Sequence, residues 1–355
     1  MEKLKKVLNE IFIEGMSGMA SGLFATLIIG TIIQQIGNII PGSIGEYLFL
    51  MGKVAAALTG AGIGCGAAVR LKSSPLVILS TAVAGMIGAF AAKIIEGSAF
   101  TDGVIHFAGP GEPLGAFIAA TVAIYIGRLV AGKTKVDILV TPFACIISGG
   151  TVGLLIGPSI SAFMMWLGSL VNWGTVQSPF LMGIIVSVLM GIILTLPISS
   201  AALGIILGLD GIAAGAAVVG CCANMVGFAV ASFRENKTNG LLAQGLGTSM
   251  LQMGNIVKKP VIWLPAIITS AILGPISTMG FAMVNNPTGS GMGTAGLVGQ
   301  INAYQAMIQT GMAPGVILYQ VILMHFVLPA VLSFLISEFM RKKGWINDGD
   351  MKLNV

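Results

Sequence analysis

A series of long apolar runs, which continues from one end of the chain to the other, limits most strongly what this sequence can fold into. A helix needs about 20 mostly apolar residues to cross a bilayer. Ten stretches approach or exceed that length, at 17–40, 46–69, 75–95, 114–131, 137–157, 180–195, 208–232, 260–283, 287–311 and 314–340. We therefore expect an all-α polytopic membrane protein with about ten transmembrane segments.

The charged residues support the same expectation, because they are few and lie at the ends of the apolar runs. Only 9% of the 355 residues are charged and 55% are hydrophobic, whereas about a quarter of the residues in soluble domains are charged. The net charge of +5 comes mainly from Lys and Arg at the ends of spans and not from a basic face, so it does not indicate nucleic-acid binding. The basic clusters near both termini predict that both termini are cytoplasmic.

The loop 233–259 conflicts with a simple count of ten crossings. Ten crossings with cytoplasmic termini place this loop outside, although it carries Arg234, Lys237, Lys258 and Lys259. A re-entrant 287–311 would place the loop inside, but it would then move Arg128–Lys135 outside or require a second re-entrant piece, for which "LPISSAALG" (196–204) is a candidate. We favour ten crossing-equivalents with both termini inside.

The spans predict two halves of five. We expect an N-terminal half at 1–158 that provides dimerisation and scaffold, and a C-terminal half at 180–340 that holds a solute site. Between them, 159–179 reads as an interfacial amphipathic helix with Trp166 and Trp173, and 341–355 as a cytoplasmic tail. The Gly/Ala-rich segments 55–75 and 211–237 resemble each other, and two halves of five spans would form an inverted repeat. The alternative is that two Gly/Ala-rich spans merely look alike.

The start of the chain also carries a pattern. Residues 1–16 read as a short amphipathic helix on the cytoplasmic surface that runs into the first span.

The stretch 285–302, "NNPTGSGMGTAGLVGQIN", is the main candidate for a binding site. It is rich in glycine, carries no charge and lies between two apolar runs. Irregular backbone at membrane depth is tolerated where it is buried in protein or lines a wet cavity. Its uncharged donors and acceptors suit a neutral, hydroxyl-rich solute, and the alternative is an ordinary extracellular loop. These residues are Asn285, Asn286, Thr288, Ser290, Thr294, Gln300 and Asn302.

Three further residues are candidates for the same solute. Glu112 precedes Pro113 at the mouth of a span, where a carboxylate can accept sugar hydroxyls or act as a solvated loop acid. His325 lies within the last span, and an intramembrane ionisable residue is a functional hypothesis by default. Asn224 is a similar intramembrane polar group. Both His325 and Asn224 could instead hydrogen-bond a neighbouring helix.

The sequence carries no pattern for catalysis, a cofactor or a metal. It has no P-loop and no His/Cys metal set. The four cysteines lie in apolar segments without metal spacing, and we interpret them as small core residues. We therefore expect a protein that is not an enzyme.

Two motifs carry a family resemblance that covers nearly the whole length. The segments "TLPISSAALGI" (195–205) and "NNPTGSGMGTAGLVGQINAYQ" (285–305) resemble the enzyme IIC-like membrane subunits of the phosphotransferase system, and in particular the perfringolysin O regulator group. The resemblance implies a homodimer in a bacterial plasma membrane with cytoplasmic termini. It also implies a sugar site in the second half, among broken helices and re-entrant hairpins, and a separate cytoplasmic IIB partner.

The sequence departs from the sugar-transporting members at one position. Those members often carry a glutamate beside a proline, together with a histidine, to hold sugar hydroxyls. Here Asn286 stands before the proline, and the Glu–Pro pair at Glu112 lies in the first half. We expect a permease of enzyme IIC type that binds and translocates a small neutral polar solute such as a sugar. The alternative is a membrane sensor or regulator that binds a similar ligand without transport.

Overall fold

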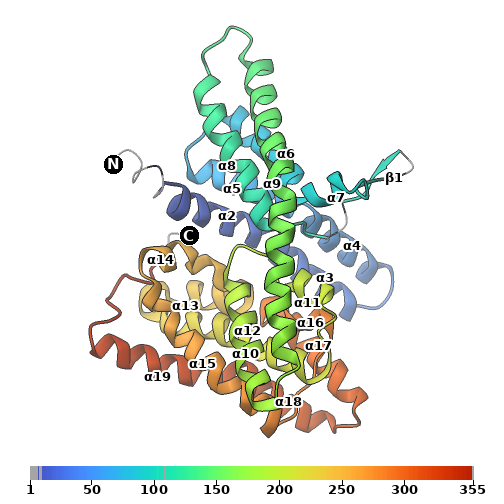
Figure 1. Cartoon of the computed structure of the whole chain (residues 1–355), viewed down its shortest axis with the longest axis vertical. Helices are drawn as coiled ribbons and strands as arrows, with labels where there is room; N and C mark the ends of the chain where they lie inside the picture. Colours follow the sequence, from blue (N-terminus) through green and yellow to red (C-terminus); the bar gives the residue numbers. More distant parts are fainter. Residues whose placement is uncertain (1–6, 8–9, 102, 108, 354–355) are drawn as a thin grey trace. The chain divides into compact units, whose positions relative to one another are not determined.

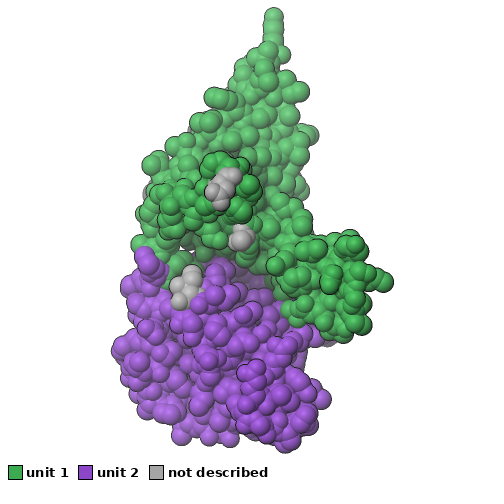
Figure 2. All heavy atoms as spheres, turned by 90° about the vertical axis from the view of Figure 1, so that its right-hand side faces the viewer, with its two compact units in different colours: residues 1–164, 355 green, residues 165–354 purple. Residues whose placement is uncertain are grey.

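The structure is a computed structural model that describes residues 7, 10–101, 103–107 and 109–353 (Figure 1). Half of the N-terminal surface helix expected at 1–16, residues 1–6 and 8–9, lies outside the described residues. Two compact units divide the chain: unit 1 extends to Met164 and unit 2 begins at Met165 (Figure 2). The described residues are almost entirely helical, as the apolar runs predicted.

Unit 1 is a helical bundle with one small hairpin. Its elements are η1 (Glu10–Gly15), α2 (Met16–Leu23), η2 (Phe24–Ile28), α3 (Ile29–Ile39), α4 (Ser43–Ala57), α5 (Thr59–Arg70), α6 (Pro75–Ala89), α7 (Ala91–Ile95), β1 (Phe100–Thr101), β2 (Val104–Ile105), α8 (Pro113–Val130) and α9 (Asp137–Thr175), which continues into unit 2. Here η denotes π-helical and 3₁₀ segments. Helices α4 and α5 bend by 54° at the break at Leu58, and together they are long and apolar enough for one broken span or a re-entrant loop.

Small residues let neighbouring helices of unit 1 approach backbone to backbone. Gly22 of α2 faces the backbone of Gly62 in α5, and Gly88 of α6 faces that of Gly115 in α8. A membrane bundle has no hydrophobic force between its helices, so close backbone packing of this kind holds it together.

Ion pairs join the N-terminal helix to the ends of two other helices of unit 1. Arg70 pairs with Glu14 at 2.8 Å, and Arg128 pairs with Glu10 at 2.7 Å. Arg128 also donates to the carbonyl oxygen of Leu71. The start of η1 and the loops after α5 and α8 therefore lie on one side of the bilayer.

Unit 2 contains the remaining helices. They are α10 (Pro179–Thr195), α11 (Ser200–Ile206), α12 (Gly211–Ala231), α13 (Phe233–Leu242), η3 (Ala243–Gly247), η4 (Ser249–Gln252), α14 (Met253–Lys258), η5 (Pro260–Trp263), α15 (Leu264–Pro275), η6 (Ile276–Gly280), α16 (Pro287–Ser290), η7 (Ala295–Leu297), α17 (Val298–Gln309), α18 (Pro314–Ile322), η8 (Leu323–Val327) and α19 (Leu328–Lys342).

Helix α12 is the centre of unit 2. It packs against α10, α15 and α19. Of its most apolar stretch of 18 residues, 89% is buried. A helix surrounded in this way needs small side chains on every face, which explains the Gly/Ala-rich sequence of 211–220. Its interior contacts are made by backbone as much as by side chains, as where Gly220 meets the backbone of Ser187 in α10.

Contacts along α12 give the direction of each neighbouring helix. On α10, Ser187 meets Gly220 and Thr195 meets Asn224, so α10 and α12 run parallel. Two parallel neighbours that are consecutive in the chain require a return passage. Residues 196–210, which include the short helix α11, provide this passage. They lead from Thr195, at the level of Asn224, back to Gly211 at the start of α12. Asn224 is thirteen residues after Gly211, so the passage covers roughly 20 Å along the helix axis.

Residues 285–309 form a re-entrant hairpin. The backbone N–H of Asn285 donates to Gly211 at the start of α12, and Thr294 contacts Met225 fourteen residues further along that helix. Gln300 then meets Cys222, and α17 returns towards the level at which the hairpin began. The expected ninth span at 287–311 therefore does not cross the membrane, because both ends of the hairpin lie at the same end of α12.

The loop 233–259 and the C-terminal tail lie on the same side of the bilayer. Arg341 pairs with Glu235 at 2.8 Å, and Lys259 pairs with Asp350 at 2.6 Å. The expectation that this loop faces the opposite side from the tail is wrong. The loop lies on the side of the tail because of two irregular segments. Residues 196–210 return across the depth of unit 2, whereas residues 285–309 do not cross. This is the arrangement that the basic residues of the loop favoured.

Helix length and hydropathy agree with a multi-pass membrane protein. Among the described residues, six helices are long and apolar enough to cross, and the bent α4–α5 pair makes a seventh if it is counted as one span. Helices α6 and α10 are shorter apolar helices. The segment 159–174 is not a separate helix but the second half of the 39-residue α9. The proposed count of ten crossing-equivalents and the inverted repeat stay predictions.

Candidate solute site

Three asparagines hold the base of the re-entrant hairpin together. The buried Asn285 side chain donates to the carbonyl of Gly299 at 3.0 Å and accepts from the N–H of Asn286 at 2.8 Å. Asn286 caps α16 by accepting from the N–H of Gly289 at 2.9 Å, and its amide donates to Asn302 at 2.8 Å. These amides therefore fix the two arms of the hairpin to each other. Asn302 in turn donates to the carbonyl of Val298.

The hydroxyl residues of the hairpin have separate positions. Ser290 is buried and donates to the carbonyl of Pro287 at 2.9 Å. Thr294 is buried at the tip, where its hydroxyl contacts the sulfur of Met225 at 3.5 Å. Thr288 is exposed on α16. Only Thr288 of the three presents its side chain on the surface of unit 2.

Gln300 and His325 form a buried polar pair in the middle of unit 2. The amide nitrogen of Gln300 lies 3.1 Å from Nδ1 of His325 and 3.3 Å from Sγ of Cys222. An amide nitrogen only donates, so Nδ1 accepts and the imidazole proton lies on Nε2. His325 is fully buried and belongs to the π-helical turn η8. Such turns are found frequently at functional sites.

Each member of this pair has one polar atom without a partner. Oε1 of Gln300 and Nε2 of His325 are buried, and neither has a hydrogen bond within the part of the chain that the structure describes. One is an acceptor and the other is a donor. Leaving a buried polar atom unpaired costs about 1–3 kcal/mol, so the pair is suited to a ligand that supplies both a donor and an acceptor.

The helix α11 meets the hairpin near its tip. The hydroxyl of Ser200 donates to the carbonyl of Gly291 at 2.7 Å, and Gly204 approaches Ser290. Ser199 caps α11 by accepting from the N–H of Ala202. The two motifs that carried the family resemblance thus lie against each other, although 91 residues separate Ser200 from Gly291 in the chain.

Asn224 belongs to a different polar network. Its amide donates to Gly220 and Ser270, and its oxygen accepts from Thr195 at 3.3 Å and from Nε1 of Trp263 at 2.8 Å. The side chain is fully buried and all its hydrogen bonds are made. The arrangement ties α10, α12 and the start of α15 together. Sequence reasoning missed Trp263, Thr195 and Ser270, because only the packing of three helices brings them to Asn224.

Glu112 belongs to unit 1. It is the N-cap of α8, and its carboxylate accepts from the N–H of Leu114 at 3.5 Å. Pro113 follows at the first helical position, where its missing N–H leaves nothing unpaired. In this structure Glu112 therefore acts as the N-terminal cap of α8.

The described residues contain no group of three or more His, Cys, Asp or Glu side chains that could hold a metal ion. The polar groups of the hairpin are amides, hydroxyls and one imidazole. They can exchange hydrogen bonds with a solute, and none is arranged as a nucleophile with an adjacent base.

Comparison with known proteins agrees with the motifs. No curated protein matches the chain. A family model described as "Phosphotransferase system, EIIC" matches residues 13–353, which is nearly the entire chain and includes α11, the hairpin and the Gln300–His325 pair. The chain therefore belongs to the EIIC family of the phosphotransferase system, the membrane permease components of that system.

Proposed function

We propose that this permease component binds and translocates a small neutral polar solute, a sugar or a polyol, and that the solute contacts Gln300 and His325. The observation that carries the proposal is the pair of buried atoms without partners, Oε1 of Gln300 and Nε2 of His325. One solute hydroxyl can donate to the first and another can accept from the second.

The charge of the surroundings supports a neutral solute. The described side chains that hydrogen-bond within the hairpin or to the Gln300–His325 pair are amides, hydroxyls, thiols and thioethers. A charged solute would be buried without a counter-charge, which is costly. The base of the hairpin at Asn285, Asn286 and Asn302 would hold the site in shape, with Ser290 and Thr294 lining it and Thr288 at its surface.

The binding experiment is a thermal-shift screen of the detergent-purified protein against a panel of sugars and polyols, followed by calorimetry on each hit. Binding raises the melting temperature, because a ligand stabilises the folded state by RT ln(1 + [L]/Kd). We expect His325→Ala and Gln300→Ala to weaken binding roughly 2- to 150-fold, which corresponds to about 0.5–3 kcal/mol for each lost hydrogen bond.

Ser333→Ala is the matched control. Its hydroxyl is equally buried, lies in α19 and donates to Thr269 at 2.9 Å, so it loses a buried hydrogen bond away from the pair. We expect it to bind the solute like the parent protein. Parent-like affinity in both the His325 and Gln300 variants would refute the proposed site.

Uptake separates a permease from a sensor. Proteoliposomes should accumulate a radiolabelled hit from the screen if the solute is translocated. Binding without any uptake, tested also with a phosphorylated IIB-type partner present, would favour the sensor or regulator that the sequence left open.

We also propose the assembly and orientation that the family resemblance implied. The protein would be a homodimer through its Gly/Ala-rich first half, with both termini in the cytoplasm. All eight basic residues of unit 2 lie in 233–259 and after Phe339, on the side of the loop and tail, which is the bias expected of a cytoplasmic face. Mass measurement in mild detergent that showed only monomer would contradict the dimer.

A further inference from the structure

The helices α3 and α4 form an antiparallel hairpin whose contact face is defined by glycines. Gly37 of α3 packs on the backbone of Gly45 and Phe49 in α4, and Gly30 packs on that of Gly52. Each helical residue turns by about 100°. The glycine contacts therefore determine which residues lie on each of the two flanks of the hairpin.

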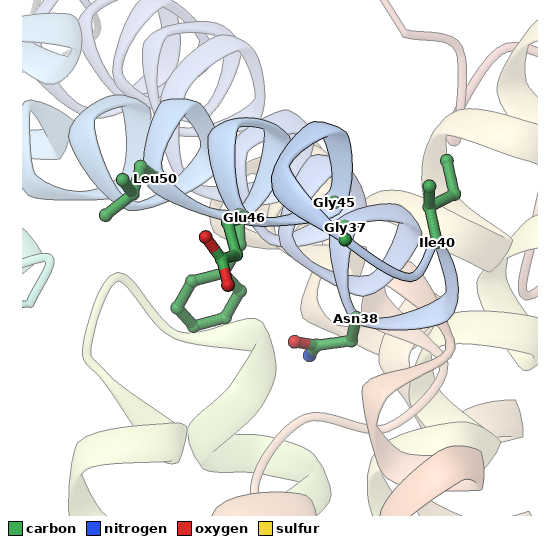
Figure 3. Close-up of a pocket in the computed structure, with 8 residues that line it drawn as sticks. Gly37, Asn38, Ile40, Gly45, Glu46 and Leu50 are labelled. Carbon is green, nitrogen blue, oxygen red and sulfur yellow. The ribbon is translucent and has the colours of Figure 1, made fainter.

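One flank of the hairpin carries polar side chains at intervals along its length, with the exposed Leu50 between two of them. On α3, Asn38 comes one residue after the contact glycine Gly37, and Gln34 lies beside Gly52 at the edge of the contact face. On α4, Glu46 and Lys53 each come one residue after a contact glycine and lie on the same flank. Asn38, Glu46 and Lys53 are exposed. Figure 3 shows the side chains of Asn38 and Glu46 pointing into the same hollow, which has a volume of about 450 Å³ and is also lined by Ile40, Phe49 and Leu50. The ammonium of Lys53 lies 5.2 Å from the centre of the Phe49 ring.

The opposite flank is apolar along its whole length. It presents the exposed side chains Ile36 (45%), Ile44 (67%) and Met51 (62%). Ile36 is two residues before Asn38, and Met51 is two residues before Lys53, so each lies on nearly the opposite side of its helix from its polar counterpart. The apolar flank suits lipid, whereas the polar flank does not.

The polar flank reaches into the depth of the bilayer. Lys53 lies ten residues after Ser43, the first residue of α4, which is about 15 Å along the helix axis or half the hydrocarbon thickness. A charged side chain at that depth is costly in contact with lipid, and such residues face a bundle interior or a water-filled cavity.

We propose that the polar flank of α3–α4, formed by Gln34, Asn38, Glu46 and Lys53, lines a water-filled cavity within the membrane through which a hydroxyl-rich solute moves. The identity of the solute rests on the proposed function. The flank offers two amides, one carboxylate and one ammonium, which together donate to and accept from hydroxyls. The two charges cancel, so the lining attracts neither cations nor anions.

Fluorescence quenching in proteoliposomes tests the cavity without any solute. A bimane label is attached to single cysteines at Lys53→Cys and Asn38→Cys, and to the matched controls Met51→Cys and Ile36→Cys. The parent carries Cys65→Ser, because the other three native cysteines are buried. Iodide reports contact with water, and nitroxides at different positions of the lipid chain report contact with lipid and depth.

We expect iodide to quench the Lys53 and Asn38 labels severalfold more strongly than the Met51 and Ile36 labels. We expect lipid nitroxides near the bilayer centre to quench the Met51 label and to leave the Lys53 label bright. Weak iodide quenching at Lys53 and Asn38 would show that protein or lipid covers the flank and would overturn the proposal. Quenching of the Met51 label only by headgroup nitroxides would place the hairpin at the surface and would overturn it equally. Neither result would touch the Gln300–His325 site, whose test is solute binding.

Discussion

The buried ion pair between the loop 233–259 and the tail gives the sharpest test of unit 2. Arg341 donates to Glu235 at 2.8 Å and to the carbonyl of Ala231, the last residue of α12, at 3.0 Å. The two side chains are 7% and 6% exposed. We expect Arg341→Met to lower the free energy of unfolding by about 3–5 kcal/mol, because removing one partner leaves the other charge buried and uncompensated.

The carboxylate of Glu235 would be left in a poor position in that variant. Its Oε2 has no hydrogen bond within the described residues even in the intact protein. Glu235→Gln should cost less, because Arg341 retains Asp348 at 3.1 Å, a partner whose side chain is 87% exposed. The double variant Glu235→Gln/Arg341→Met should be more stable than the sum of the two single losses predicts, since no charge remains unpaired.

The assay is unfolding by SDS in mixed micelles, followed by tryptophan fluorescence. Arg234→Met is the matched control, because Arg234 pairs with Glu338 at 2.6 Å but is 57% exposed, and exposed pairs contribute about 0–1 kcal/mol. If Arg341→Met lost no more stability than Arg234→Met, or if the double variant were additive, the pair would not hold the loop to the tail.

Three further predictions follow from unit 2. Cysteines placed at Lys237 and Lys352 should react with an impermeant thiol reagent from the same side of oriented vesicles; reaction from opposite sides would contradict the re-entrant assignment of 285–309. Burial alone would raise the pKa of the Asp350 carboxyl, but hydrogen bonds from Lys259 and from a backbone N–H outweigh it and hold the pKa below its usual value. The stability that Asp350 contributes should therefore be full above its unfolded pKa of about 3.9 and be lost as the pH falls through the lower folded pKa. If the parent stayed more stable than Asp350→Asn at the lowest pH, that result would be inconsistent with this pairing. Gly293 has a φ of +53° and packs on Met225 and Cys221, so Gly293→Val should lower the melting temperature strongly, and a parent-like melting curve would mean that the hairpin tip is not packed as described.

Sequence patterns predicted the apolar helices well because a membrane span is a local property. The runs at 114–131, 180–195 and 208–232 correspond to α8, α10 and α12 with ends that differ by at most three residues. Direction is not local. The parallel course of α10 and α12 follows from contacts at Ser187 and Thr195, and no periodicity in the sequence encodes such contacts.

The placement of the loop 233–259 could have been predicted more firmly than it was. Its four basic residues indicated the cytoplasmic side, and the acids Glu235 and Asp350 now pair with basic residues across the loop and tail. Counting 287–311 as a span outweighed that signal. A run of 25 residues with six glycines and no strong apolar face was the weaker of the two indications.

Polar residues at membrane depth were the hardest to assign, because their partners lie far away in the chain. Asn286 reads as a solute ligand in isolation, yet it caps α16 and binds Asn302. Asn224 reads in the same way, yet Trp263 and Ser270 satisfy it. The sequence shows which residues can form hydrogen bonds, and only the fold shows which of those bonds are already made.

This distinction explains why a hairpin so rich in amides and glycines carries no charge. A hairpin that enters the membrane must satisfy its own backbone, and the asparagines at its base do so through caps and carbonyls. A charged residue in their place would need a counter-charge at the same depth. Glycines at the tip allow the backbone to meet α12 closely, as Gly293 does at Cys221. Among the polar side chains that the hairpin brings together, Oε1 of Gln300 and Nε2 of His325 remain without a partner, one acceptor and one donor, which is a set that can orient a hydroxylated solute.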